Sequence, residues 1–169
     1  FETIIITGDR DLTQLATDNV TIYYTKKGVT DVDHYTPKFI AEKYNGLVPK
    51  QIIDMKGLMG DTSDNIPGVA GVGEKTAIKL LNQFESVEGV YEHIEEVTAK
   101  KLKEKLINSK DDALMSKDLA TINVHSPIEV SLEDTKLTLQ DDTAEKIELF
   151  KKLEFKQLLA DIDTPSNNE

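Results

Sequence analysis

The distribution of glycine is the feature of the sequence that most restricts its fold. Five of the nine glycines fall within residues 57–73, directly before the amphipathic stretch 74–84. In that stretch Ala77, Leu81 and Phe84 recur at the spacing of one helical face. Glycine reaches backbone conformations that close tight turns, whereas it weakens the interior of a helix. The pattern therefore predicts a glycine-built turn that leads directly into a helix over 74–84.

The N-terminal third of the sequence indicates an α/β fold. Ile4–Ile6 form a β-branched run that ends at Thr7-Gly8-Asp9, a pattern typical of a buried strand. Residues 20–24 and 29–32 predict a hairpin, and 128–132 a further strand. Short helices are expected between these elements, and 85–125 and 142–159 are expected to be mostly helical. The fold class is therefore α/β, with a parallel sheet first and a mostly helical C-terminal half.

Charge and composition exclude several classes of protein. The chain carries 31 acidic and 20 basic residues, a net charge of -11, which normally argues against a nucleic-acid partner. Residues 100–110 are a local exception with five lysines and one glutamate, compatible with either a solvated helix or a DNA contact. The absence of cysteine removes disulfides and thiolate chemistry. Without a basic leader or a run of about 20 apolar residues, a cytoplasmic location is expected.

Two pairs of carboxylates are candidate metal ligands. Asp9 and Asp11 follow the first strand, where ligands gather in open α/β sheets. Asp61 and Asp64 lie three residues apart, on one side of a helical turn. Such carboxylates suit Mg²⁺, which takes a few carboxylates together with water. The alternative is a polar turn in which these residues cap helices. An EF-hand is excluded because its ligand spacing is missing.

The glycine turn is a candidate phosphate-binding element. Gly71 and Gly73 would let a phosphate approach the backbone, and the N-terminus of the following helix adds partial positive charge. Lys75 and Lys79, one turn apart, would add two charges. The segment resembles the helix-hairpin-helix element of DNA-binding proteins and is not a Walker loop, because Glu74 stands where that motif needs lysine. The alternative is a helix entry that binds nothing.

Together, these motifs resemble the 5′ nuclease family. The segments TGDRDLTQL (7–15) and DTSDNIPGVAGVGEKTA (61–77) are similar to the 5′→3′ exonuclease, or flap endonuclease-like, domain of bacterial DNA polymerase I. The likeness runs to about residue 156 and implies a partial 5′-nuclease (PIN-like) fold. It implies a division into part of the α/β core (1–60), the helix-hairpin-helix (61–84), a helical remainder (85–163) and a linker (164–169).

The resemblance also implies a reaction and its residues. Members hydrolyse phosphodiester bonds at 5′ ends, flaps or nicks of DNA by a two-metal mechanism with Mg²⁺ or Mn²⁺, in primer removal and repair. The hairpin also binds K⁺ in that family, and a polymerase portion is covalently linked. The implied catalytic metal ligands are Asp9, Asp11 and Asp61, with Asp64 as a ligand or directly behind one. The implied DNA-binding residues are Gly68, Gly71, Gly73, Lys75, Thr76 and Lys79.

One departure from the family changes the expected activity. Members begin with another strand ending in Asp, a helical arch and a Glu-x-Asp-Asp cluster, and the sequence contains no Glu-x-Asp-Asp. The chain also begins in a strand without an initiator methionine. We therefore expect it to be the C-terminal part of the nuclease and to be nearly inactive alone. The alternative functions are a non-catalytic helix-hairpin-helix module that binds duplex DNA and an acidic interaction domain that binds none.

Overall fold

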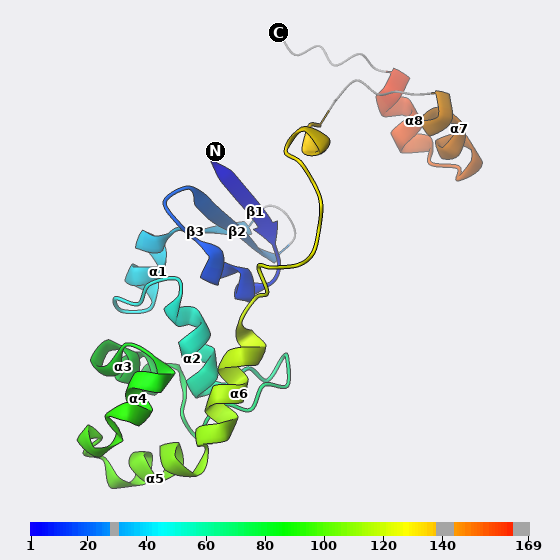
Figure 1. Ribbon diagram of the computed structural model, residues 1–169. Coiled ribbons are helices and arrows are strands. Elements are labelled where there is room, and N and C mark those ends of the chain that lie inside the picture. The colour runs from blue at the N-terminus through cyan, green and yellow to red at the C-terminus, as the bar shows by residue number, and fades with distance from the viewer. Residues whose placement is uncertain (28–30, 138–143, 164–169) are drawn as a thin grey trace. The chain divides into compact units, whose positions relative to one another are not determined.

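The structure, a computed structural model, describes residues 1–27, 31–137 and 144–163. The chain divides into two units, Phe1–Val124 and His125–Glu169, each described here by itself (Figure 1). Residues 28–30 of the predicted hairpin, which include the start of its second predicted strand, and the predicted linker at 164–169 lie outside the described residues. None of the described helices is both long and apolar enough to cross a lipid bilayer.

The first unit contains a three-stranded mixed sheet in the order β1-β2-β3. Its strands are β1 (Thr3–Thr7), β2 (Val20–Lys27) and β3 (Asp31–Tyr35). β1 pairs in parallel with β2, with Thr3 opposite Val20, and β2 pairs antiparallel with β3. The connection from β1 to β2 contains a 3₁₀ helix, η1 (Arg10–Leu15). The predicted parallel pairing is confirmed, and the hairpin adds the antiparallel strand.

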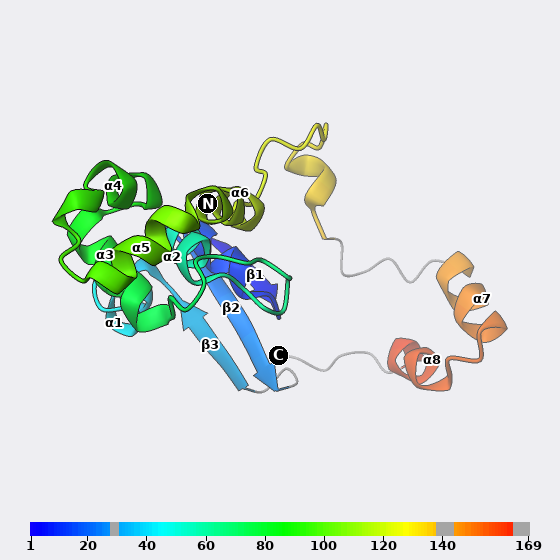
Figure 2. The same cartoon turned by 90° about the horizontal axis from the view of Figure 1, so that it is seen from below.

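The remaining elements of this unit are helical, as the sequence predicts. They are α1 (Pro37–Lys43), α2 (Gln51–Met59), α3 (Glu74–Phe84), α4 (Val87–Glu92), η2 (Ile94–Glu96), α5 (Lys100–Asn108) and α6 (Lys110–Ala120). Thr36 caps α1 by accepting the Phe39 N–H, with proline at the first helical position. Viewed from two directions, α2 and α6 lie next to the sheet and α3–α5 lie beyond them (Figures 1 and 2).

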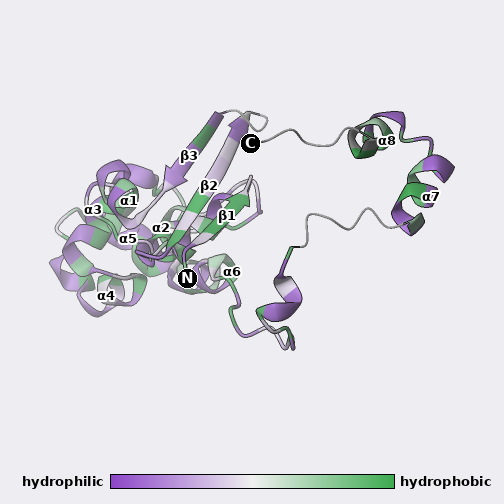
Figure 3. Ribbon diagram, turned by 90° about the horizontal axis from the view of Figure 1, so that it is seen from above, coloured by the Kyte–Doolittle hydropathy of each residue, from purple (hydrophilic) through white to green (hydrophobic). Residues whose placement is uncertain are grey.

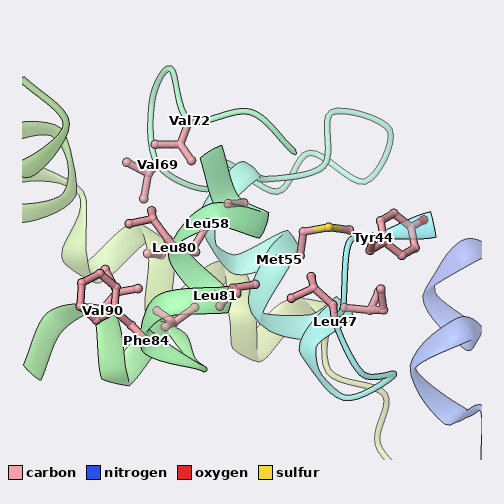
Figure 4. Packing of buried hydrophobic residues seen from close by; sticks show 14 of the residues in the cluster. Tyr44, Leu47, Met55, Leu58, Val69, Val72, Leu80, Leu81, Phe84 and Val90 are labelled. Atoms are coloured by element: carbon pink, nitrogen blue, oxygen red, sulfur yellow. The ribbon is translucent and has the colours of Figure 1, made fainter. Parts of the chain in front are cut away.

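Helix α2 lies at the centre of the hydrophobic core. Six of its nine residues are buried, because it contacts η1, α3, α4 and α6 together. Its Leu58 is covered by Val69 and Val72 of the glycine-rich segment, which also lie over Leu80 of α3 (Figure 4). The largest fully buried apolar side chains of the unit are Ile22, Tyr35, Ile40, Leu47, Leu58, Leu81 and Leu106. The glycine-rich segment is therefore part of the core on its inner side.

Polar contacts, some buried and some partly exposed, fix α6 against the rest of the unit. The Lys117 ammonium of α6 pairs with Asp54 of α2 at 2.7 Å and with Glu88 of α4 at 2.5 Å. Gln14 of η1 donates to the Ala120 carbonyl at 2.9 Å and accepts the Ile122 N–H at 3.0 Å. Since buried polar groups are costly unless paired, these contacts favour one arrangement of the helices.

Two sequence-based expectations about strands are wrong. Ile4 and Ile6 are 53% and 71% exposed, because β1 is an edge strand and the described residues cover only the face on which Ile5 lies. β1 is accordingly a hydrophobic (green) element at the edge of the sheet in Figure 3. The predicted strand over 128–132 does not form among the described residues. Its alternating apolar side chains are exposed, and the sheet of the described residues contains only β1, β2 and β3.

Among its described residues, the second unit contains short helices and no strand. They are η3 (Glu133–Thr135), α7 (Ala144–Lys152) and α8 (Lys156–Asp163). Residues 142 and 143 of the predicted helical stretch 142–159 lie outside the described residues, and the rest of it forms two helices separated near Leu153. The ring centroids of Phe150 and Phe155 are 6.1 Å apart. The candidate site residues all belong to the first unit.

Candidate metal centre and hairpin

Three predicted metal ligands from two distant segments meet in one place. Carboxylate oxygens of Asp11, Asp61 and Asp64 all lie within 4.8 Å of one another. Asp11 is in the first turn of η1, whereas Asp61 and Asp64 follow the C-terminus of α2. Asp61 and Asp64 border a cavity of about 600 Å³, which is lined by Gly8, Asp9, Arg10, Tyr24, Lys56, Met59, Gly60, Asp61, Thr62, Ser63 and Asp64.

Asp9, the fourth predicted ligand, has a different position. It lines the same cavity but is not a member of the group of three. Its Oδ1 accepts the Asp11 N–H at 2.9 Å, and its own N–H donates to Thr7 Oγ1 at 3.0 Å. Asp9 therefore caps η1, the role that the alternative interpretation of the sequence gave it, and thereby fixes the backbone of Asp11.

The loop that carries Asp61 and Asp64 is held by backbone contacts. Asp61 and Ile66 exchange two backbone hydrogen bonds of 2.9 and 2.8 Å. Gly60 and Gly68 have positive φ angles of 73° and 59°, and their backbones pack directly against each other. A Cβ on Gly68 would therefore lie 2.6 Å from Gly60 Cα. Because a side chain fits at neither position, the sequence needs glycine at both for this loop to close.

A contact that sequence reasoning missed connects this loop to α6. The Gly68 N–H donates to Ser116 Oγ at 2.9 Å, and both groups are buried. The next amide, that of Val69, donates to the Leu58 carbonyl of α2 at 2.8 Å. The amide of Gly68, one of the predicted DNA-binding residues, thus points into the protein. No sequence signal marks Ser116, which lies 48 residues away.

Lys56 of α2 is the second residue that sequence reasoning missed. Its ammonium pairs with Asp61 Oδ2 at 2.8 Å and also with Asp11 Oδ1, and the residue is 7% exposed. Hydrogen bonds from Lys56 and Ser63 lower the pKa of Asp61 to about 2. No sequence pattern marks Lys56, because Gln51 and Asp54 also interrupt the apolar residues of this stretch.

The charge state of Asp61 gives a pH prediction. The pKa of Asp61 is lowered to about 2 from 3.8, so the stability that its ionised form contributes is complete above about pH 4 and is lost as the pH falls towards 2. We expect a ¹³C NMR titration of this carboxylate to have its midpoint near pH 2. We also expect Asp61→Asn to lower the melting temperature at pH 6 much more than at pH 2. An NMR midpoint near 4 would contradict the Lys56 contact.

The three grouped carboxylates are chemically suited to a divalent cation. Carboxylate oxygens are the preferred ligands of Mg²⁺ and Mn²⁺, and oxygens bound to one ion at about 2.1 Å lie within about 4.2 Å of each other. Asp11 Oδ1 is shielded from solvent and has an ammonium as its counter-charge, so a cation already belongs at this point of the structure. The donor set and its spacing therefore fit such an ion with small adjustments.

The exposed part of the glycine-rich segment leads into α3. Gly71 has a φ of 75° and is exposed, and Gly73 is the N-cap of α3. The first amides of a helix have no partner within that helix, so this end suits an anion. Lys75 and Lys79 of α3 are exposed, and Thr76 is half-buried. The Lys105 ammonium of α5 lies directly beside Gly71. This contact brings the lysine-rich stretch 100–110 next to the hairpin.

Comparison with known proteins places the chain in a family. The model of the family described as 5′-3′ exonuclease, C-terminal SAM fold, matches residues 47–143. DNA polymerase I of Bacillus subtilis is 62% identical over 160 residues, which are 94% of this chain and 18% of that protein. DNA polymerase I of Bacillus caldotenax is 53% identical over 170 residues, or 100% of this chain and 19% of that protein. The chain thus spans about a fifth of the length of these curated relatives.

Solved structures extend the comparison to the fold. A zinc-bound structure of T5 5′-exonuclease is 26% identical, with a TM-score of 0.62 over 70% of this chain and 42% of that chain. The catalytic core of Rad2 in complex with DNA has a TM-score of 0.55 at 20% identity, over 92% of this chain and 52% of that chain, and this likeness shows the fold alone. On the family match and these likenesses, the chain belongs to the family of 5′-3′ exonucleases with the C-terminal SAM fold.

Proposed function

We propose that this chain is part of a metal-dependent 5′ nuclease of the DNA polymerase I type, which hydrolyses phosphodiester bonds at 5′ ends or flaps of DNA. The observation that carries the proposal is the meeting of carboxylate oxygens of Asp11, Asp61 and Asp64 within 4.8 Å, beside a cavity that Asp61 and Asp64 line. The relatives named DNA polymerase I and the T5 exonuclease support the same reaction. Roles in primer removal and repair stay predictions from the resemblance and are part of the proposal.

In this proposal the chain's own residues prepare a site for Mg²⁺ or Mn²⁺. Asp11, Asp61 and Asp64 would hold the ion, and Asp9 and Ser63 would orient two of these ligands through their hydrogen bonds. Divalent cations at such sites supply Lewis acidity and an activated water for phosphodiester hydrolysis. The two-metal arrangement, and K⁺ at the hairpin, stay predictions from the resemblance.

The DNA strand would be held by the exposed part of the hairpin. Gly71 and Gly73 let a phosphate reach the backbone at the N-terminus of α3, and Lys75, Thr76 and Lys79 lie on the first turns of that helix. Gly68 contributes by closing the loop, since its amide donates to Ser116. Because these contacts read only the phosphate backbone, they suit a nuclease that selects DNA by shape.

The hairpin proposal predicts a salt-dependent loss of DNA affinity. Each lysine that contacts a phosphate contributes about 1 to the slope of log K against log salt. We expect the double variant Lys75→Gln, Lys79→Gln to bind duplex DNA more weakly and to reduce that slope by about 2. Fluorescence anisotropy of a labelled duplex, titrated at several salt concentrations in Ca²⁺, measures both quantities.

The matched control changes a lysine that lies outside the hairpin, at the start of α2. Lys50, exposed before the first turn of α2, is replaced by glutamine, and we expect the slope to stay as in the wild type. A slope that is the same in the double variant and in the wild type would contradict the assignment of Lys75 and Lys79.

A further inference from the structure

We propose that Lys56 is a built-in counter-cation of the metal centre, which a divalent ion must displace in order to bind. In the structure the Lys56 ammonium contacts two of the three grouped carboxylates, those of Asp11 and Asp61. The residue then sets how tightly the centre binds metal and how stable the chain is without it. This inference rests on the proposed metal centre.

The position of Lys56 is unusual for a lysine. Its side chain is 9% exposed, and lysine is almost never buried to this degree unless its charge is paired. The ammonium reaches the two carboxylates from α2, while Asp11 comes from η1 and Asp61 from the loop after α2. One positive charge therefore joins two segments that are 50 residues apart in the sequence.

Electrostatics explains why a cation belongs there before any metal binds. Three carboxylates whose oxygens lie within 4.8 Å repel one another strongly when all are ionised. The positive ammonium group offsets part of this repulsion. It also neutralises the negative charge on Asp11 Oδ1, which is shielded from solvent. Without Lys56, the metal-free centre would have to hold these charges together with no counter-charge from α2.

Competition with metal follows from the atoms involved. Asp11 Oδ1 and Asp61 Oδ2 are both contacted by the ammonium, and both belong to carboxylates that the ion would use. A divalent ion and an ammonium group cannot occupy the same point between two oxygens, so the ion pairs must break as metal binds. The free energy needed to break the two ion pairs makes the free energy of metal binding less favourable by the same amount. The long lysine stem allows the withdrawal, because Lys56 borders the cavity of about 600 Å³.

The test compares variants that remove the charge but keep the stem. Lys56→Met preserves the apolar length of the side chain, Lys56→Gln is a second neutral variant, and Lys50→Met makes the same change at an exposed position before α2. Binding of Mn²⁺ to the 169-residue chain is measured by isothermal titration calorimetry. We expect Lys56→Met and Lys56→Gln to bind Mn²⁺ about tenfold more tightly than the wild type, the scale of one shielded ion pair. Lys50→Met should match the wild type.

A second readout separates competition from general damage to the fold. In EDTA, both Lys56 variants should melt at a lower temperature than the wild type, whereas saturating Mn²⁺ should raise their melting temperatures by more than it raises that of the wild type. A Mn²⁺ affinity that is equal to or weaker than that of the wild type would overturn the role of Lys56, and so would an unchanged melting temperature in EDTA.

The outcomes also distinguish this inference from the proposed function. If the wild type binds Mn²⁺ and Asp61→Asn does not, the metal centre stands, and the Lys56 variants decide the inference alone. If Asp61→Asn binds Mn²⁺ as well as the wild type does, the proposed centre itself is wrong. If neither the wild type nor the Lys56 variants bind Mn²⁺, both proposals are overturned.

Discussion

Replacing Asp61 by asparagine is expected to remove metal binding and DNA cleavage together. Asp61 contributes a carboxylate to the group with Asp11 and Asp64, and its Oδ1 is held by the Ser63 N–H at 2.9 Å. Asparagine keeps the shape and this hydrogen bond but loses the charge. Substitutions behind metal ligands already cost 10- to 100-fold, so removing a ligand is expected to reduce Mn²⁺ affinity and cleavage more than about 100-fold.

The measurement uses two forms of the protein. Mn²⁺ affinity is measured by calorimetry on the 169-residue chain, and cleavage of a labelled 5′-flap DNA on a polypeptide that carries this chain and has the length of the curated relatives. The control is Asp18→Asn, an exposed aspartate outside the carboxylate group. Cleavage by Asp61→Asn at the wild-type rate would contradict the proposal and favour the non-catalytic DNA-binding module.

Replacing Gly68 by alanine is expected to destabilise the first unit severely. The residue has a φ of 59°, and a Cβ there would lie 2.6 Å from Gly60 Cα and 2.6 Å from the Met59 carbonyl carbon. Both neighbours are backbone atoms, so the loop and the end of α2 must move apart. A left-handed conformation combined with such a clash is expected to cost about 3 kcal/mol or more. That loss corresponds to about 10 °C in melting temperature.

Gly73 provides the matched control for stability. It also belongs to the glycine-rich segment, but its φ is −103° and no atom lies within 4 Å of a Cβ built on it. Gly73→Ala is therefore expected to change the free energy of unfolding by less than about 1 kcal/mol. Thermal unfolding followed by circular dichroism compares the two variants. Equal melting temperatures would show that the loop does not close through Gly60 and Gly68.

Some elements of the fold could be predicted from the sequence because they depend on the spacing of residues that are close together in the chain. The spacing of Ala77, Leu81 and Phe84 predicted α3, and the β-branched run Ile4–Ile6 predicted the strand β1. Burial of β1 was not readable in this way. Ile4 and Ile6 have strand-forming side chains whatever covers them, and only the arrangement of the unit decides that they are exposed.

The same division applies to the candidate centre. Asp9, Asp11, Asp61 and Asp64 stood out because each pair occurs at a spacing of two or three residues. The sequence did not show that Asp9 caps η1 while the other three aspartates form one group, because that grouping depends on where the loop after α2 lies. Lys56 was missed because a single lysine carries no pattern.

By itself, the sequence determined the α/β class, the glycine turn before α3 and the carboxylates that could hold metal, because these follow from local spacing and backbone preference. Only the tertiary structure decided which carboxylates meet, that Gly68 donates to Ser116, and that Lys56 lies between Asp11 and Asp61. The physical reason is that those contacts join segments some 50 residues apart. The packing of buried α2 and the close backbone contact between Gly60 and Gly68 bring these segments together.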